Sequence, residues 1–258
     1  MAEKSKYASE TVGLPSRGWF YEKDSSLSSG TIELKLMTAK EENILSSVNL
    51  VEKGVAVDRL LQALIVDPEI KFNDLLLGDK NGIMIAARIL GYGKDYPVTS
   101  ICPICSTAAI TTIDLQKIEE NKVEFKEEDR YKNEFQFKLP VSNRTLTFKF
   151  LTHGDEMAID KEVVALESLE DSPEISPDFT TRLFYSILSV DGDSKVATRK
   201  NFVENEFLAR DSLAFRNHVQ SIRPDIDLTV DVECSKCKSG RRLRVPITSD
   251  FFWPGEGV

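Results

Sequence analysis

The sequence contains little of the chemistry on which hydrolytic enzymes depend. Only two of its 258 residues are histidines, His153 and His218, and neither accompanies a Gly-x-Ser-x-Gly turn or a cysteine in a catalytic pattern. The stretch GYGKDY (91–96) lacks the spacing of a phosphate-binding loop and its Ser or Thr. Hydrolysis and nucleotide binding are therefore unsupported, and we expect a structural or binding protein rather than an enzyme.

Long apolar runs are also missing. The longest, around Leu60–Val66 and Ile83–Leu90, are much shorter than the ~20 residues that a membrane-spanning helix needs. Residues 1–10 are not followed by the apolar segment that is typical of a signal peptide. We therefore expect no membrane span, and a soluble chain that is synthesised in a reducing cytoplasm.

An excess of positive charge is absent as well. The 33 Lys and Arg residues against 42 Asp and Glu residues give a formal net charge of -9. A broad nucleic-acid-binding surface needs clustered basic residues, so this charge disfavours one. The content of 41% hydrophobic and 29% charged residues is that of a folded protein, and the length suits one large domain or two small ones.

Helical patterning dominates the first part of the chain. Thr38 and Glu41 are three residues apart, so their side chains can bond each other's backbone N–H groups as a capping box. Apolar residues then recur at helical spacing, and Gly54 is suited to end this helix in a left-handed conformation. A later helix is predicted to begin at Asp79.

The cysteines form two Cys-x-x-Cys pairs, Cys102 with Cys105 and Cys234 with Cys237. Each pair lies between two stretches of alternating apolar residues, which predicts a turn at the tip of a β-hairpin. Two such turns can hold one zinc ion by four thiolates at ~2.3 Å, even when a long insertion such as residues 106–233 separates them. We therefore predict a zinc-ribbon-like site made by all four cysteines.

Other interpretations of the cysteines remain open. A thioredoxin-type redox pair is followed by a helix, whereas strand-like sequence follows both pairs here. Disulfides are rare in a reducing compartment, and the four residues could also be separate buried thiols. No histidine or carboxylate replaces a thiolate, so a zinc ion at this site would be structural and not catalytic.

A group of basic residues follows the second cysteine pair: Lys236, Lys238, Arg241, Arg242 and Arg244. Such a group raises an alternative function, a zinc-ribbon regulatory protein that binds nucleic acid. However, a zinc ion held by four thiolates carries a net negative charge, which nearby cations would stabilise without any ligand. Nucleic acid is therefore not the partner we expect.

Together these patterns predict an α+β fold with a helical block, antiparallel hairpins and a zinc-ribbon-like four-cysteine site. The predicted segments are an N-terminal arm and short strand (1–37), a helical block (38–96), a discontinuous zinc-ribbon-like module (97–118 and 226–249), an inserted α+β region (119–225) and an aromatic C-terminal tail (250–258). Within the inserted region we predict a hairpin (135–151) and three helices (155–169, 179–188 and 208–222).

Large aromatic residues lie near both ends of the chain. Trp19 and Phe20 interrupt the polar arm, and they can dock either on the protein's own core or on a neighbouring subunit. Phe251, Phe252 and Trp253 lie in the C-terminal tail. Because aromatic side chains are over-represented at interface hot spots, we take these five residues as candidate contacts with other subunits.

Several short stretches, spread from residue 14 to residue 254, together resemble the baseplate hub subunit family of T-even-like contractile-tailed bacteriophages. The stretches are LPSRG (14–18), Gly30 with IEL (32–34), MTAKEE (37–42), GDKN (78–81), IAAR (85–88), LGYG (90–93), LTHGDE (151–156), ARD (209–211), PD (224–225) and FFWP (251–254).

The resemblance implies a component or assembly factor of the baseplate hub that acts through protein–protein contacts and catalyses no reaction. It also implies a location in the virion tail baseplate, after synthesis in the host bacterial cytoplasm. The expected partners are other baseplate hub and tail proteins, within a symmetric oligomeric assembly. The zinc prediction is independent of the resemblance, because it depends on the spacing of the four cysteines.

Overall fold

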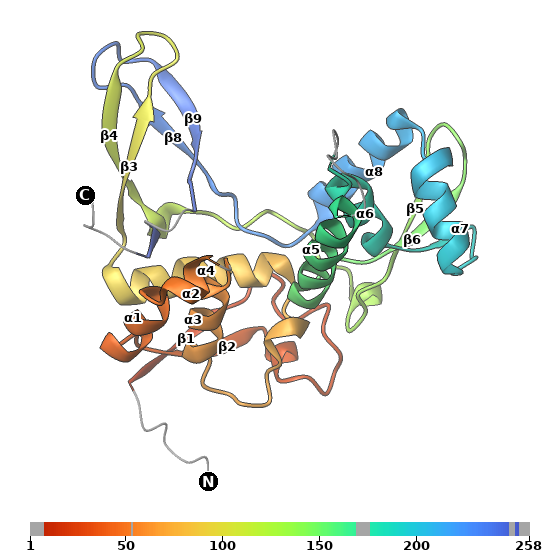
Figure 1. Ribbon diagram of the computed structural model, residues 1–258, viewed down its shortest axis with the longest axis horizontal. Helices are drawn as coiled ribbons and strands as arrows, with labels where there is room; N and C mark the ends of the chain where they lie inside the picture. The colour runs from red at the N-terminus through yellow and green to blue at the C-terminus, as the bar shows by residue number, and fades with distance from the viewer. Residues whose placement is uncertain (1–7, 53, 169–175, 248–250, 253–258) are drawn as a thin grey trace.

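The computed structural model describes residues 8–52, 54–168, 176–247 and 251–252. It has the predicted α+β architecture: helices accompany small antiparallel sheets, and the four cysteines lie close together. Two hairpins project from the body of the molecule, beside a lobe that contains the three-stranded sheet (Figure 1).

The described part of the N-terminal segment, from residue 8, is folded onto the body of the protein. Strand β1 (Ser9–Gly13) pairs antiparallel with the predicted strand, β2 (Thr31–Lys35), so that Val12 lies opposite Ile32. The intervening loop folds back onto the protein's own core.

The helical block contains α1 (Ala39–Leu45), α2 (Val48–Glu52), α3 (Ala56–Leu64) and α4 (Leu77–Tyr92). The capping box of Thr38 and Glu41 is confirmed at the start of α1. The single helix predicted to run on to Gly54 is instead divided after Ser46, the C-cap residue of α1. Serine hydroxyls compete for backbone hydrogen bonds, which weakens a helix at such a position.

The projecting hairpins are formed by β3 (Asp95–Ile101) with β4 (Ala108–Asp114), and by β8 (Thr229–Glu233) with β9 (Gly240–Arg244). Each is a separate two-stranded antiparallel sheet. They lie side by side, although more than a hundred residues separate them along the chain (Figure 1).

The region between the hairpins contains a three-stranded sheet in the order β5-β6-β7. Its elements are β5 (Phe135–Lys138), β6 (Thr145–Phe148), α5 (His153–Glu167), α6 (Asp178–Ser186), β7 (Ile187–Val190), α7 (Val196–Asn201), a π-helix (Phe202–Glu206) and α8 (Ala209–Ile222). Strand β7 begins directly after α6, where the sequence had predicted continued helix. Short 3-10 helices occupy Ser26–Ser29, Phe72–Asp74, Leu115–Lys117 and Glu127–Asp129.

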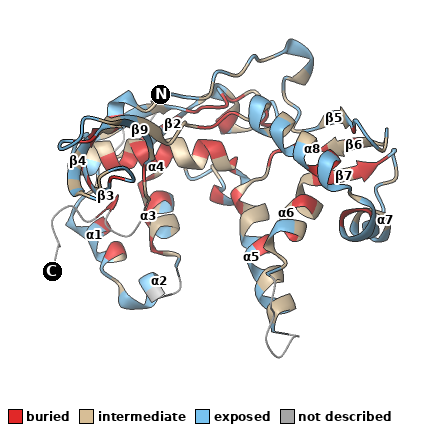
Figure 2. Ribbon diagram, turned by 90° about the horizontal axis from the view of Figure 1, so that it is seen from above, coloured by how far each residue is buried: buried red, intermediate tan, exposed pale blue. Residues whose placement is uncertain are grey.

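Two clusters of buried apolar side chains support these elements. The larger one joins the N-terminal segment, α3, α4 and the bases of the projecting hairpins, and the smaller one joins the three-stranded sheet to α6 and α8. Buried residues follow α4 and β7 in Figure 2. The partly buried residues Phe135, Val219 and Ile222 pack against both clusters. The division into the five predicted segments stays a prediction.

The terminal aromatics require a correction. Phe20 is 7% exposed, and Phe251 and Phe252 are fully buried, so these three side chains are core residues and not surface contacts. Phe251 lies 5.1 Å from the ring of Tyr96, in the base of the hairpin module. Trp19 is half-buried, and Trp253 lies outside the described residues.

The first turns of α4 bind the loop between β1 and β2. Asp79 is fully buried and accepts hydrogen bonds from the backbone N–H of Ser16 (2.8 Å), the Ser16 hydroxyl (2.6 Å) and the Tyr21 hydroxyl (2.5 Å). The Tyr21 oxygen in turn accepts a bond from the N–H of Leu76. Burial raises the pKa of Asp79, against the effect of these donors.

The same turns of α4 also bind the segment that leads into β8. An ideal Cβ on Gly78 would lie 1.9 Å from the carbonyl oxygen of Pro224, so only glycine allows this approach. The next residues continue the contact, since the Asn81 amide donates to Asp225 at 3.0 Å. On the neighbouring turn, a Cβ on Gly82 would meet the Pro15 ring at 2.8 Å.

We expect Gly78→Ala to lower the free energy of unfolding by about 2 kcal/mol or more, because the new methyl group meets backbone that cannot easily move. Gly13→Ala is the matched control, since no atom lies within 4 Å of its added Cβ. Chemical denaturation of both variants measures the difference, and equal stability would contradict the packing described for Gly78.

A pH dependence is expected for the buried Glu41. Burial opposes its ionisation, but hydrogen bonds from Lys35 and Thr38 outweigh burial and lower its pKa from 4.5 to about 2. Its carboxylate therefore stabilises the fold above about pH 4.5, and this contribution is lost as the pH falls towards 2. Glu41→Gln should cost about 1 kcal/mol at pH 7 and progressively less in acid. A deficit that stays constant with pH would argue against this linkage.

Candidate metal centre

The first cysteine pair lies in the turn between β3 and β4. The N–H of Cys102 donates to the carbonyl of Thr107 (2.9 Å), and the N–H of Ser106 donates back to the carbonyl of Cys102 (2.9 Å). Ser106 adopts a left-handed conformation with φ of 53°. The turn is therefore tight and hydrogen-bonded, and it fixes the directions of both thiols.

The second pair lies in an equivalent turn between β8 and β9. The N–H of Cys234 donates to the carbonyl of Ser239 (3.0 Å), and the N–H of Lys238 donates to the carbonyl of Cys234 (3.0 Å). Lys238 has a φ of 58°, which matches that of Ser106. The two turns thus share one backbone pattern, as expected from their equal Cys-x-x-Cys spacing.

The two turns bring all four sulfur atoms together. The four Sγ atoms lie within 4.8 Å of one another, and the distances from Cys102 to Cys237 and from Cys105 to Cys234 are both 3.7 Å. A tetrahedral metal with ~2.3 Å bonds to sulfur separates its ligands by about 3.8 Å. A disulfide would need ~2.05 Å, and the four cysteines are free thiols. The spacing therefore fits a shared metal ion.

The surroundings of the thiols favour partial ionisation only. The backbone N–H groups of Cys105 and Ile104 lower the pKa of Cys102 to about 5. The N–H groups of Cys237 and Lys236 favour the Cys234 thiolate too, but its burial and the neighbouring sulfurs leave its pKa raised. Four adjacent thiolates repel one another, so a divalent cation is what would allow all four to ionise.

Arg241 joins the two hairpins beneath the sulfur cluster. Its guanidinium donates to the hydroxyl of Ser100 (2.6 Å) and to the carbonyl of Ile101, both on β3. This arginine belongs to the basic group for which nucleic-acid binding was the alternative. Its observed contacts are with its own chain.

Two other members of that basic group lie near carboxylates. Arg242 lies 3.6 Å from Asp227 and 3.8 Å from Asp231, and Lys238 lies 3.7 Å from Glu233. These carboxylates therefore partly balance the positive charge on and around β9.

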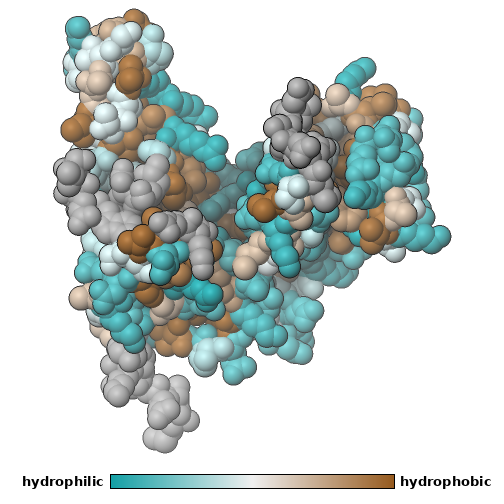
Figure 3. Space-filling view, viewed as in Figure 1, coloured by the Kyte–Doolittle hydropathy of each residue, from teal (hydrophilic) through white to brown (hydrophobic). Residues whose placement is uncertain are grey.

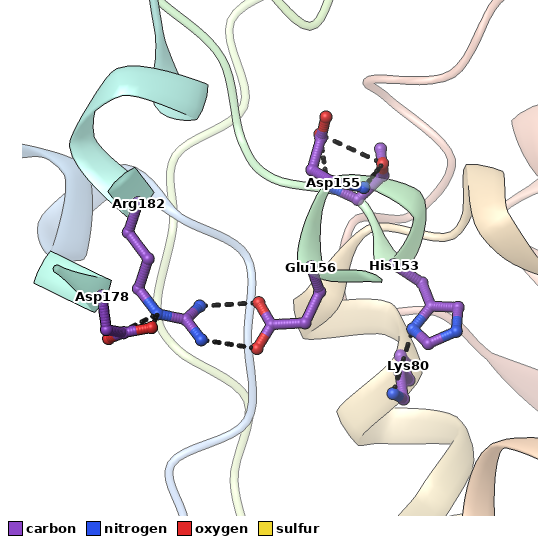
Figure 4. Close-up of polar contacts among 7 residues, drawn as sticks. Lys80, His153, Asp155, Glu156, Asp178 and Arg182 are labelled. Atoms are coloured by element: carbon purple, nitrogen blue, oxygen red, sulfur yellow. Dashed lines mark hydrogen bonds and ion pairs between the residues drawn. The ribbon is translucent and has the colours of Figure 1, made fainter. Parts of the chain in front are cut away.

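The His153 region is the other place where the sequence groups possible ligands. There, Asp155 forms a capping box with Thr152, and the His153 Nδ1 atom lies 3.1 Å from the Lys80 ammonium (Figure 4). Burial, followed by the charge of Lys80, lowers the pKa of His153. The neighbouring Glu156 forms a bidentate ion pair with Arg182 at 2.6 and 2.8 Å. These groups position α5 against α4 and α6.

Within the described parts of the chain, the four cysteines are the one group of three or more ligating residues placed to hold a metal ion. The fold and this site together define a protein in which two distant segments of the chain meet at a cluster of four thiols. A family model described as T4 bacteriophage base plate protein matches residues 20–253. The chain therefore belongs to this family of phage baseplate proteins.

Comparison with curated proteins and with solved structures found no match. The family suggests a non-enzymatic role and implies association with other phage tail proteins in the virion tail. Among the described helices, none is long and apolar enough to cross a lipid bilayer.

We expect the purified protein to bind one Co²⁺ ion per chain, with the thiolate-to-metal absorption of a tetrahedral four-sulfur site. Cys105→Ser and Cys234→Ser should each weaken binding strongly, because each removes one of four ligands. Ser235→Ala, in the same turn as Cys234, should leave binding unchanged. Titration followed by absorption measures the affinity, and wild-type binding by both cysteine variants would contradict the site.

Proposed function

We propose that the protein is a structural component of the baseplate hub, held in shape by a structural zinc ion and acting through contacts with other tail proteins. The observation that carries this proposal is the family match over residues 20–253. The expected setting is a symmetric assembly at the end of a contractile tail, and no reaction is involved.

The buried polar groups support a structural role. Arg88 is fully buried, and it donates to the backbone carbonyl of Gly93 at 2.8 Å. Asp211 is also fully buried, and it accepts from the N–H groups of Val141 and Ser142. These charged side chains fix the backbone groups that they bind, and they do not reach the surface. Their role is therefore structural.

Zinc is the metal that suits the cysteine site best. Four thiolates in a tetrahedral arrangement select zinc or iron, and a closed site made only of cysteine is typical of structural zinc. Such an ion would join Cys102 and Cys105 to Cys234 and Cys237, and so would close the chain around the inserted lobe. Elemental analysis of protein purified without added metal tests this choice, and stoichiometric iron would contradict it.

The role in assembly is tested in the phage. Purified tails or their assembly intermediates should contain the chain, and phage lacking it should accumulate incomplete baseplates. Supplying Cys234→Ser should restore few complete tails, because a metal ion would then no longer join the tips of the two hairpins, whereas Ser235→Ala should restore them fully. Electron microscopy and the titre of infectious particles measure the outcome. Normal tails in the absence of the protein would contradict the proposal.

A further inference from the structure

The β3–β4 hairpin has a largely apolar face that is exposed to solvent. Its register pairs Thr99 with Ile110 and Ile101 with Ala108, and directly paired residues on alternate positions share one face of a hairpin. Ile101 is 68% exposed and Ile110 is 73% exposed. These four residues, together with the preceding Pro97, form what we call the outer face.

The side chains of the outer face are exposed, but not because the hairpin is poorly packed. On the opposite face, Tyr96, Val98 and Ile113 are buried in the larger core cluster. The hairpin is therefore packed on its inner side, and its outer face is left uncovered. At the tip, Ile104 adds a further side chain that is 71% exposed, between the two cysteines of the turn.

Apart from the paired Asp95 and Asp114 at its base, the outer face also lacks charge. Residues 96–113 include no Asp, Glu, Lys, Arg or His, although 29% of the chain is charged. The sister hairpin is the opposite, because its exposed positions include Asp231, Glu233, Arg242 and Arg244. In Figure 3, pale and brown residues predominate on the upper part of the projecting module. The β8–β9 hairpin thus has the charged composition of an ordinary solvated surface, whereas the β3–β4 hairpin presents a largely uncharged one.

The composition of the outer face indicates which class of partner it can bind. A nucleic acid needs cationic side chains, and residues 96–113 offer none. A peripheral membrane contact is typically anchored by Lys, Arg or Trp, which are absent from the same residues. An uncharged apolar surface of another protein fits isoleucine, proline and threonine side chains without leaving a charge unpaired.

The size of the outer face argues against a dimer of this chain. Each strand has 7 residues. At ~3.3 Å per residue the hairpin is about 23 Å long, and two strands of ~5 Å each make it about 10 Å wide, so the face covers roughly 230 Å². A stable pair of proteins typically buries about 800 Å² on each partner. The outer face alone is too small for such a pair, but it suits one contact among several in a larger assembly.

We propose that the outer face and the tip residue Ile104 dock against an apolar, uncharged surface of a different baseplate protein. This inference rests on the proposed function, because it takes the partner to be a neighbouring tail subunit. The four-thiol cluster lies at the same tip, so a bound metal would hold the contact surface rigid before docking and reduce the entropy lost on binding.

The test uses the double variant Ile104→Ser/Ile110→Thr, in which Thr keeps the β-branched shape that strands favour. The control is Arg242→Thr, on the exposed side of the sister hairpin. Each is supplied to phage lacking the protein, and its incorporation into purified baseplates is measured. We expect purified baseplates to contain at least about tenfold less of the double variant than of the wild-type protein. The control should match the wild type, and both purified variants should keep their metal content and melting temperature.

A second measurement covers the case in which the double variant does not fold. A photo-crosslinking amino acid at Ile110 should attach the chain to a different baseplate protein in assembled particles, whereas the same amino acid at Arg242 should not. Normal incorporation of the folded double variant, or no crosslink from Ile110, overturns the docking inference and leaves the proposed function standing. Normal tails without any of this protein overturn the proposed function itself.

Two further outcomes would identify a different occupant and so overturn the inference. One is a concentration-dependent dimer of the wild-type protein, seen by analytical ultracentrifugation and lost in the double variant. The other is flotation of the wild-type protein with vesicles of phosphatidylcholine and phosphatidylglycerol, again lost in the double variant.

Discussion

The buried carboxylate of Asp79 is the group on which the larger core depends. A fully buried charge is tolerated only when donors surround it, and its donors, Ser16 and Tyr21, belong to a loop about sixty residues earlier in the chain. Beside it, Gly78 admits the Pro224 carbonyl and Asn81 binds Asp225. One end of α4 therefore fixes the N-terminal loop and also the segment that leads into β8.

The projecting module is held at both of its ends. At its base, the Tyr96 hydroxyl donates to the carbonyl of Pro246, and the Tyr96 ring packs on Phe251. At its tip, the four thiols converge. Between these points the two hairpins form separate sheets with no strand pairing across them. Because an isolated two-stranded sheet is marginally stable, the contacts at base and tip, with Arg241 between the hairpins, give the module its shape.

Features with local signals could be predicted from the sequence, and features set by distant partners could not. The capping box of Thr38 and Glu41 and the two Cys-x-x-Cys turns depend on residues within a few positions. The convergence of the four cysteines is a long-range exception, which the matching Cys-x-x-Cys spacing indicated because two such turns can share one metal ion. Strand β1 has one apolar residue on its core side and becomes a strand by pairing with β2. The role of Asp79 in binding Ser16 and Tyr21 was missed because these partners are remote in the sequence.

The terminal aromatics and β7 were missed for similar reasons. Phe251 and Phe252 fill a space created by elements more than a hundred residues earlier, so a position near the chain end gave no sign of burial. Strand β7 follows α6 with no glycine, proline or turn between them, so the change from helix to strand is imposed by pairing with β6.

The two cysteine turns are synthesised at different times during translation. A ribosome adds roughly 5–20 residues per second, so the 129 positions from Cys105 to Cys234 take about 6–26 s to synthesise. Until then the nascent chain contains only two of the four thiols that converge at the tip. A metal ion that needs all four thiols could therefore be bound only after the second turn is made, and a chain terminated between the two turns would lack the finished tip.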